Sequence, residues 1–139
     1  MQEVLANRRI LVLEDEVLIA LDLSFAIEDA GGMVAGPVDT AEGALRLINE
    51  KVVQGAILDV NLVDGDSTLV VERLIELDKP FIIQTGLGLP AALAARFPDL
   101  TVHFKPSDSG LIVRQLLAMI EAQSQPNAID CNPSGAASG

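Results

Sequence analysis

The segment GAILDVNL carries a single carboxylate, Asp59, directly after an apolar run. Such a run is typical of a buried strand, where a charge is costly unless it has a partner. Glu14 and Asp15 follow the apolar run RILVL in the same way, Thr85 ends FIIQT, and Lys105 follows TVHF. These residue types could together hold a metal ion and a phosphoryl group.

The chemistry depends on bringing the three carboxylates to one place. Carboxylates at one sheet edge repel one another and raise one another's pKa unless a cation lies between them. Oxygen ligands suit Mg²⁺, which also accepts a phosphate oxygen. The Thr85 hydroxyl and the Lys105 ammonium could hold the oxygens of a transferring phosphoryl group. Asp59 is then the nucleophile, and the expected product is an acyl phosphate.

The elements expected along the chain explain how these residues would meet. Strands are predicted at residues 9–13, 33–38, 55–59, 80–86 and 101–104, and helices at 16–30, 39–48, 67–77, 89–97 and 107–122, the last with Ser107 as its cap. Because parallel strands need crossover connections, this alternation predicts an α/β fold with a doubly wound, five-stranded parallel sheet. In such sheets the site lies at the carboxyl ends of the strands, where all five residues are placed.

Composition narrows the class of protein. The formal net charge of -11, with 20 acidic and 9 basic residues, would repel nucleic acid, so no direct nucleic-acid binding is expected. No apolar run has the length of a membrane span, and the N-terminus lacks the pattern of a secretory signal. We therefore expect no membrane insertion and a cytoplasmic location. The single cysteine, Cys131, has no partner for an internal disulfide and no expected role.

The domain boundaries follow from the same pattern. Residues 1–7 are predicted to be an N-terminal extension and residues 8–122 to form one folded domain. Residues 123–139 consist largely of small and turn-forming residues, which bury too little apolar surface to offset the cost of ordering. A disordered C-terminal tail is therefore expected.

The motifs VLEDE, LDVNL, QTG and FKP, in this order and spacing, resemble the receiver domain of bacterial two-component response regulators. The resemblance covers about residues 8–122 and implies a flavodoxin-like fold with strand order 2-1-3-4-5. It implies that Asp59 is the phosphoacceptor and that Asp15 binds Mg²⁺ directly. Glu14 would act through metal-bound water, and the backbone carbonyl of Asn61 would complete the protein ligands.

The remaining site residues are assigned by the same resemblance. Thr85 would hydrogen-bond the phosphoryl group, and Lys105 would pair with it, oriented by a cis bond to Pro106. The segment KPFIIQTGLG also resembles the PFxFATGY signature of a receiver subfamily associated with HWE-type histidine kinases. It departs from that signature at Gln84, which replaces Ala, and at Leu87, which replaces Tyr.

The resemblance implies a single-domain response regulator that takes a phosphoryl group from a histidine kinase and acts on a downstream protein or drains phosphate. It would be a phosphoacceptor and not an enzyme acting on other substrates. One alternative is a degenerate receiver that serves as a protein-binding adaptor. A haloacid-dehalogenase-like phosphatase is disfavoured because Val60 and Asn61 follow Asp59 where those enzymes carry a DxD motif, and because no cap domain is evident.

Receivers commonly carry Tyr or Phe three residues before the lysine, and that ring turns inward on activation. Here the position is Val102, which is stiff about χ1 and has no ring to move. We therefore expect residues 86–97, with two glycines near their start, to carry the readout.

Other polar residues have simpler interpretations. Glu16 is expected to begin the first helix, where an acid complements the helix dipole. Asp64 and Asp66 are expected to be turn and cap residues. His103 is expected to be packed or solvated.

Overall fold

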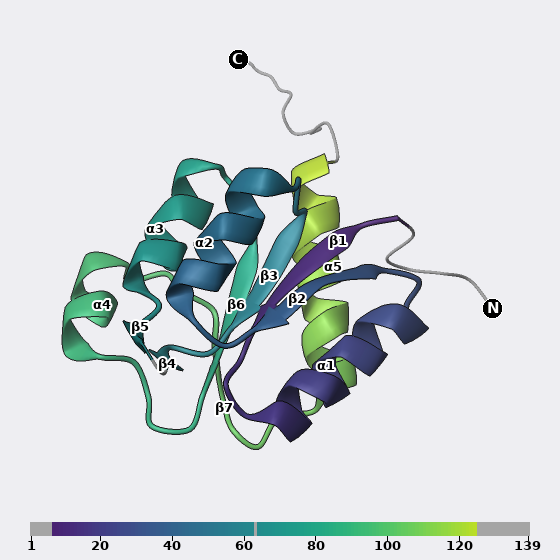
Figure 1. The fold of residues 1–139 in the computed structure, drawn as a ribbon. Helices are drawn as coiled ribbons and strands as arrows, with labels where there is room; N and C mark the ends of the chain where they lie inside the picture. The colour runs from purple at the N-terminus through teal and green to yellow at the C-terminus, as the bar shows by residue number, and fades with distance from the viewer. Residues whose placement is uncertain (1–6, 63, 125–139) are drawn as a thin grey trace, which may run out of the picture.

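A computed structural model describes residues 7–62 and 64–124. Its centre is a five-stranded parallel sheet with the order β2-β1-β3-β6-β7 (Figure 1). The strands are β1 Arg9–Leu13, β2 Met33–Val38, β3 Gly55–Leu58, β6 Phe81–Thr85 and β7 Val102–Phe104. The helices are α1 Val17–Asp29, α2 Ala41–Glu50, α3 Thr68–Glu76, α4 Ala91–Arg96 and α5 Ser109–Ser124. The predicted doubly wound α/β fold and its strand order are confirmed.

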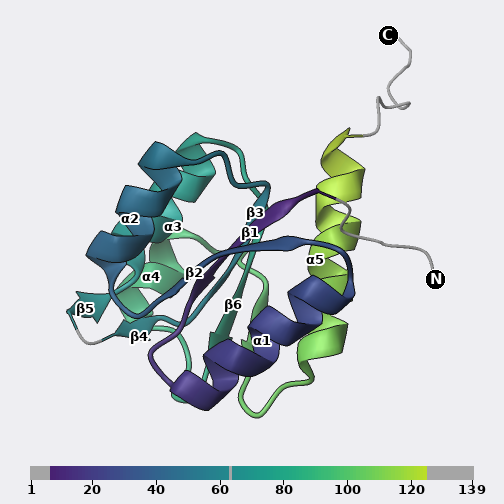
Figure 2. The same cartoon turned by 45° about the vertical axis from the view of Figure 1, so that its right-hand side comes forward.

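The sheet is covered by helices on both faces. Because side chains alternate along a strand, Leu11 and Leu13 of β1 join a core with α2, α3 and α4, whereas Ile10 and Val12 join a core with α1 and α5. Figure 2 shows α1 and α5 together on one side of the sheet and α2, α3 and α4 on the other. Burial on both faces explains why the central strands are continuous apolar runs.

Capping interactions set the helix ends. α1 ends before Gly31, whose φ of 86° lies in the left-handed region that glycine adopts without strain. The predicted cap of the last helix is wrong: the Asp108 carboxylate accepts the backbone N–H groups of Gly110 and Leu111, while the Ser107 hydroxyl donates to the Phe104 carbonyl. A carboxylate at this position also complements the dipole of α5.

A short antiparallel hairpin follows β3 and was not predicted. Its strands are β4 Asn61–Leu62 and β5 Gly65–Asp66. The Asp64 carboxylate accepts the first two backbone N–H groups of α2, at 3.0 and 3.3 Å, and Asp66 accepts that of Thr68 at 3.0 Å. The two acids therefore act as caps, as expected, and Asp64 ties the hairpin to α2.

The chain ends lie largely outside the described residues. These include residues 1–6 and 125–139, so most of the predicted extension and tail, and Cys131, cannot be compared with the structure. α5 continues to Ser124, two residues beyond its expected end. None of the helices in residues 7–62 and 64–124 has the length and apolar character needed to cross a bilayer.

Candidate functional site

The carboxyl ends of β1, β3, β6 and β7 bring the predicted site residues to one edge of the sheet. β1 and β3 pair in parallel, and the Asp59 N–H donates to the Leu13 carbonyl at 2.8 Å, so Asp59 lies beside the residues that follow β1. On the other side, the Lys105 N–H donates to the Thr85 carbonyl at 2.8 Å. Sheet hydrogen bonds therefore fix the backbone positions of the site.

Lys105 is the centre of this site. Its Nζ lies 3.0 Å from Glu14 Oε2, 3.1 Å from Asp59 Oδ2 and 3.1 Å from Glu16 Oε2. An ammonium group has three N–H donors, so three carboxylates can satisfy it completely. The side chains of Glu14, Asp59 and Lys105 are 1%, 6% and 10% exposed, which strengthens these charged hydrogen bonds.

Four carboxylates are close enough to share one cation. Glu14, Asp15, Glu16 and Asp59 each offer an oxygen, and these oxygens all lie within 4.8 Å of one another. Asn61, the other predicted ligand, donates its backbone N–H to Asp59 Oδ1 at 3.2 Å. With Asp59, it lines a shallow cavity of about 270 Å³. A set of hard oxygen donors fits Mg²⁺.

The charges of the site are unbalanced without a divalent cation. Burial raises the pKa of Glu14 from 4.5 to about 7, although hydrogen bonds from the Glu16 N–H and from Lys105 oppose this. Burial, and then the charge of Asp59, also raise the pKa of Asp15. For Lys105, burial would lower the pKa, but hydrogen bonds to Glu14, Glu16 and Asp59 outweigh it and raise the pKa. A bound divalent cation would relieve this excess of negative charge.

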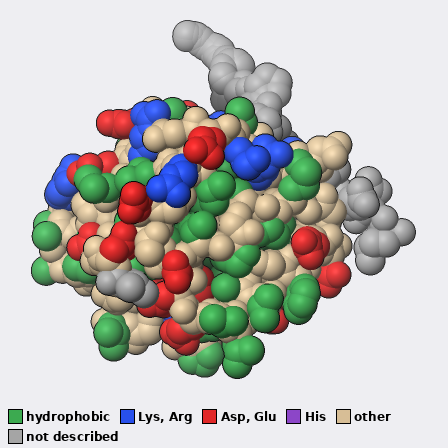
Figure 3. Space-filling view, viewed as in Figure 1, with side chains coloured by type: hydrophobic (Ala, Val, Ile, Leu, Met, Phe, Trp, Pro, Cys, Tyr) green, Lys and Arg blue, Asp and Glu red, His purple; other side chains and the backbone are tan. Residues whose placement is uncertain are grey.

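The surface carries the same imbalance. In Figure 3, acidic side chains are spread over the left, the lower centre and the right of the visible face, whereas Lys and Arg side chains lie in its upper half. An anionic ligand would be repelled by such a surface. Lys105 offers a local positive charge against this repulsion.

Thr85 is placed at the site edge but its hydroxyl is directed to its own loop. Its oxygen accepts the N–H groups of Leu87 and Gly88 at 3.2 and 3.1 Å, and the hydroxyl lies 3.3 Å from the Gly88 carbonyl as its acceptor. These bonds, rather than any to Asp59 or Lys105, are the ones found for the hydroxyl among the described residues. The bond between Lys105 and Pro106 is cis, as predicted.

Glu16 is the site residue whose contact was missed. It was expected only to begin the first helix, yet its side chain reaches Lys105. The available signal was its place as the third acid of VLEDE, directly after a strand. His103 instead is half-buried near α5, with its Nε2 2.5 Å from Gln115 Oε1, in agreement with the expected packed or solvated residue.

Comparisons with known proteins identify first the fold and then the family of this chain. No protein-family profile matches the chain. A receiver domain protein (CheY-like) from Methanospirillum hungatei has the same fold, with a TM-score of 0.75 at 20% identity over 85% of this chain and 97% of that one. SdrG from Sphingomonas melonis is 39% identical, with a TM-score of 0.68, over 83% of this chain and 97% of SdrG. The chain belongs to the response regulator receiver family.

This receiver is also similar to a longer protein. It is 43% identical over 115 residues to the phyllosphere-induced regulator PhyR of Methylorubrum extorquens, covering 78% of this chain and 43% of PhyR. The chain therefore spans less than half the length of that relative. A structure described as the BeF3-activated conformation of SdrG is 38% identical to the receiver, with a TM-score of 0.64, over 83% of this chain and 98% of that one.

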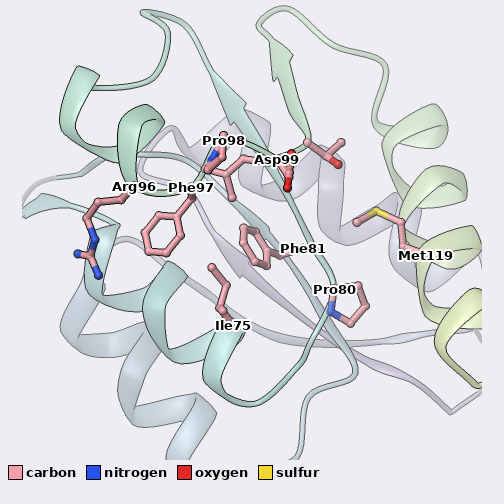
Figure 4. Close-up of a pocket in the computed structure, with 10 residues that line it drawn as sticks. Ile75, Pro80, Phe81, Arg96, Phe97, Pro98, Asp99 and Met119 are labelled. Atoms are coloured by element: carbon pink, nitrogen blue, oxygen red, sulfur yellow. The ribbon is translucent and has the colours of Figure 1, made fainter.

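A second cavity of the receiver lies away from these residues. It is an apolar groove of about 340 Å³ at the amino end of β6, opposite the end that carries Thr85. Figure 4 shows Phe81 and Phe97 facing this groove, with Met119 of α5 at its other side. The groove contains none of the predicted site residues.

Proposed function

We propose that this receiver accepts a phosphoryl group on Asp59 from the phosphohistidine of a histidine kinase, with Mg²⁺ as cofactor. The observation that carries the proposal is the contact of Asp59 with Lys105 inside a cluster of four carboxylates. A nucleophile, a fixed positive charge and a set of metal-binding oxygens are the groups that phosphoryl transfer requires. The similarity to SdrG and PhyR supports a signalling role.

The transfer is an in-line displacement at phosphorus. A carboxylate oxygen of Asp59 forms the new O–P bond, the N–P bond of the phosphohistidine breaks, and its electron pair leaves with the imidazole. Lys105 neutralises charge on the phosphoryl oxygens, and its buried position keeps it aimed at Asp59. Mg²⁺, held by Asp15, Asp59 and the Asn61 carbonyl with Glu14 through water, would neutralise further charge on these oxygens.

The response to phosphorylation follows from Thr85. Its hydroxyl now binds the loop after β6, so hydrogen bonding to a phosphoryl group requires it to leave the N–H groups of Leu87 and Gly88. Those groups must then find new partners, which changes the loop. We propose residues 86–97 as the partner surface, because this segment begins with the two groups that Thr85 would release, at Leu87 and Gly88.

The finer assignments are also proposals. The KPFIIQTGLG segment supports a kinase of the HWE type, although Ile83, Gln84 and Leu87 depart from the subfamily signature. The receiver is a phosphoacceptor that acts in the cytoplasm by binding another protein or by draining phosphate from the kinase. It is not an enzyme acting on other substrates. If partner binding needs no phosphorylation, the adaptor alternative is correct.

Labelling with acetyl phosphate tests the proposal. The intact mass of the protein should increase by one phosphoryl group when Mg²⁺ is present, and the modified residue should be Asp59. Asp59→Asn and excess chelator should each abolish the increase. Asp66→Asn, which removes one acid from the neighbouring hairpin, should not. Labelling that survives Asp59→Asn would contradict the mechanism.

A further inference from the structure

We propose that Glu16 is a positioning residue that holds Lys105 in the unphosphorylated receiver and gives up this contact when a phosphoryl group arrives. It thereby opposes phosphorylation and favours its loss. This inference rests on the proposed function of Asp59. Its structural basis is the 3.1 Å contact between Glu16 Oε2 and Lys105 Nζ.

The side chain of Glu16 has no competing structural task among the described contacts. Glu16 is the N-cap residue of α1, but its side chain makes no capping hydrogen bond. Glu16 lies in the turn between β1 and α1, where its backbone N–H donates to Glu14 Oε2 at 3.0 Å. This bond holds the Glu16 backbone beside the site. The carboxylate is therefore used on Lys105 and not on the helix that it begins.

The three N–H donors of Lys105 are matched by Glu14, Glu16 and Asp59 in the resting site. Once Asp59 carries the phosphoryl group, its charge lies on the phosphoryl oxygens, and the donor that faced Asp59 can pass to one of them. A second phosphoryl oxygen can bind Lys105 only if Glu14 or Glu16 leaves. Glu14 is almost fully buried, and removing Lys105 would leave its charge without a partner, whereas Glu16 is 61% exposed and can be hydrated when released. Of the two, Glu16 is therefore the carboxylate that is displaced.

The charge of Glu16 acts in the same direction. A phosphoryl group on Asp59 carries roughly -1.5 to -2 charges and replaces the single charge of that carboxylate, beside the three that remain on Glu14, Asp15 and Glu16. Neutralising Glu16 removes one repulsion and frees one donor of Lys105. For charges a few ångströms apart near a protein surface, this amounts to about a three- to tenfold change in the affinity for a phosphoryl mimic.

The experiment compares beryllofluoride binding by wild type, Glu16→Gln, Glu16→Asp and Glu28→Gln at saturating Mg²⁺, measured by calorimetry. Glu28 lies twelve residues further along α1, so Glu28→Gln makes the same change in net charge roughly 18 Å away. Glu16→Asp keeps the charge but shortens the side chain, which separates repulsion from contact. NMR of the Lys105 side chain reports whether its ammonium environment changes.

The expected result is a dissociation constant about three- to tenfold lower for Glu16→Gln, unchanged for Glu28→Gln and intermediate for Glu16→Asp. The Lys105 side-chain signal should shift in Glu16→Gln before any beryllofluoride is added. If wild type binds beryllofluoride and Glu16→Gln binds it equally or more weakly, the inference is wrong while the proposed function stands. If wild type binds none, both fail.

Discussion

The hydroxyl of Thr85 makes two hydrogen bonds with Gly88: it accepts the Gly88 N–H at 3.1 Å and lies 3.3 Å from the Gly88 carbonyl, which can accept its proton. Thr85 ends a buried strand, whereas Gly88 lies in the following loop with a φ of 89°. Thr85, which is fixed in the sheet, thus holds the following loop. Gly88 leaves the backbone of this loop free to change conformation.

Removing this hydroxyl should separate phosphorylation from its readout. Thr85→Ala is expected to change Mg²⁺ affinity by less than about twofold, because the hydroxyl does not belong to the carboxylate cluster. Partner binding by Thr85→Ala should no longer depend on phosphorylation, while Thr85→Ser, which keeps the hydroxyl, should behave like wild type. Lys105→Ala should also lose the coupling. Titrations of metal and of partner measure the two properties separately, and phosphate-dependent binding by Thr85→Ala would place the coupling elsewhere.

Activation should alter residues 86–97 while Val102 keeps its rotamer. The Thr85 hydroxyl is bonded to this loop, and a valine side chain has no large alternative position. Amide exchange and NMR shifts with and without beryllofluoride measure the response, and the methyl signals of Val102 serve as the internal control. Changes concentrated in α1 or α2, with residues 86–97 unaffected, would show that another element is the switch.

Mg²⁺ binding should depend on pH through Glu14. Burial raises the pKa of this carboxyl to about 7, so the folded protein without a cation binds more protons than the unfolded chain between pH 4.5 and 7. Its stability therefore falls as the pH rises through this window. A cation requires the ionised form, so Mg²⁺ affinity should rise up to about pH 7, by at most about tenfold per pH unit. Calorimetry at several pH values measures the slope, which Glu14→Gln should largely remove.

Two leucines of α1 provide a test of the core. Leu23 is fully buried between the helix and the sheet, whereas Leu18 is 80% exposed. Leu23→Ala should lower the free energy of unfolding by about 2–5 kcal/mol through lost burial and a residual cavity. Leu18→Ala, the same substitution on the same helix, should change it by less than about 0.5 kcal/mol. Urea denaturation measures both, and equal losses would contradict the assigned faces of α1.

The fold could be predicted from the sequence wherever burial determines the residue type. β1 and β3 are apolar because helices cover both sides, and such runs are visible without any structure. The helix predicted at residues 89–97 is shorter in the structure, Ala91–Arg96, because Pro90 is suited to precede a helix and not to lie within one. The β4–β5 hairpin was missed because two-residue strands show no periodicity.

The site was predictable to the level of backbone position. Asp59 and Lys105 directly follow strands, so the parallel topology alone brings them to one edge. The contact of Glu16 with Lys105 depends on the turn between β1 and α1, where Glu16 has φ -89° and ψ 113°. Sequence spacing does not fix a side-chain direction in such a turn. For the same reason, the sequence does not predict that the Thr85 hydroxyl bonds to Leu87 and Gly88.

The apolar groove at the amino end of β6 joins parts of the receiver that need not move together. Arg96 and Phe97 enter it from the end of α4, while Phe81 belongs to the sheet and Met119 to α5 (Figure 4). A small molecule that contacts both sides would favour one placement of α4 over another. If phosphorylation displaces α4, thermodynamic linkage requires that it change the affinity of such a molecule by the same factor by which the molecule shifts phosphorylation. In that case the groove would act as an allosteric site, apart from the acidic cluster.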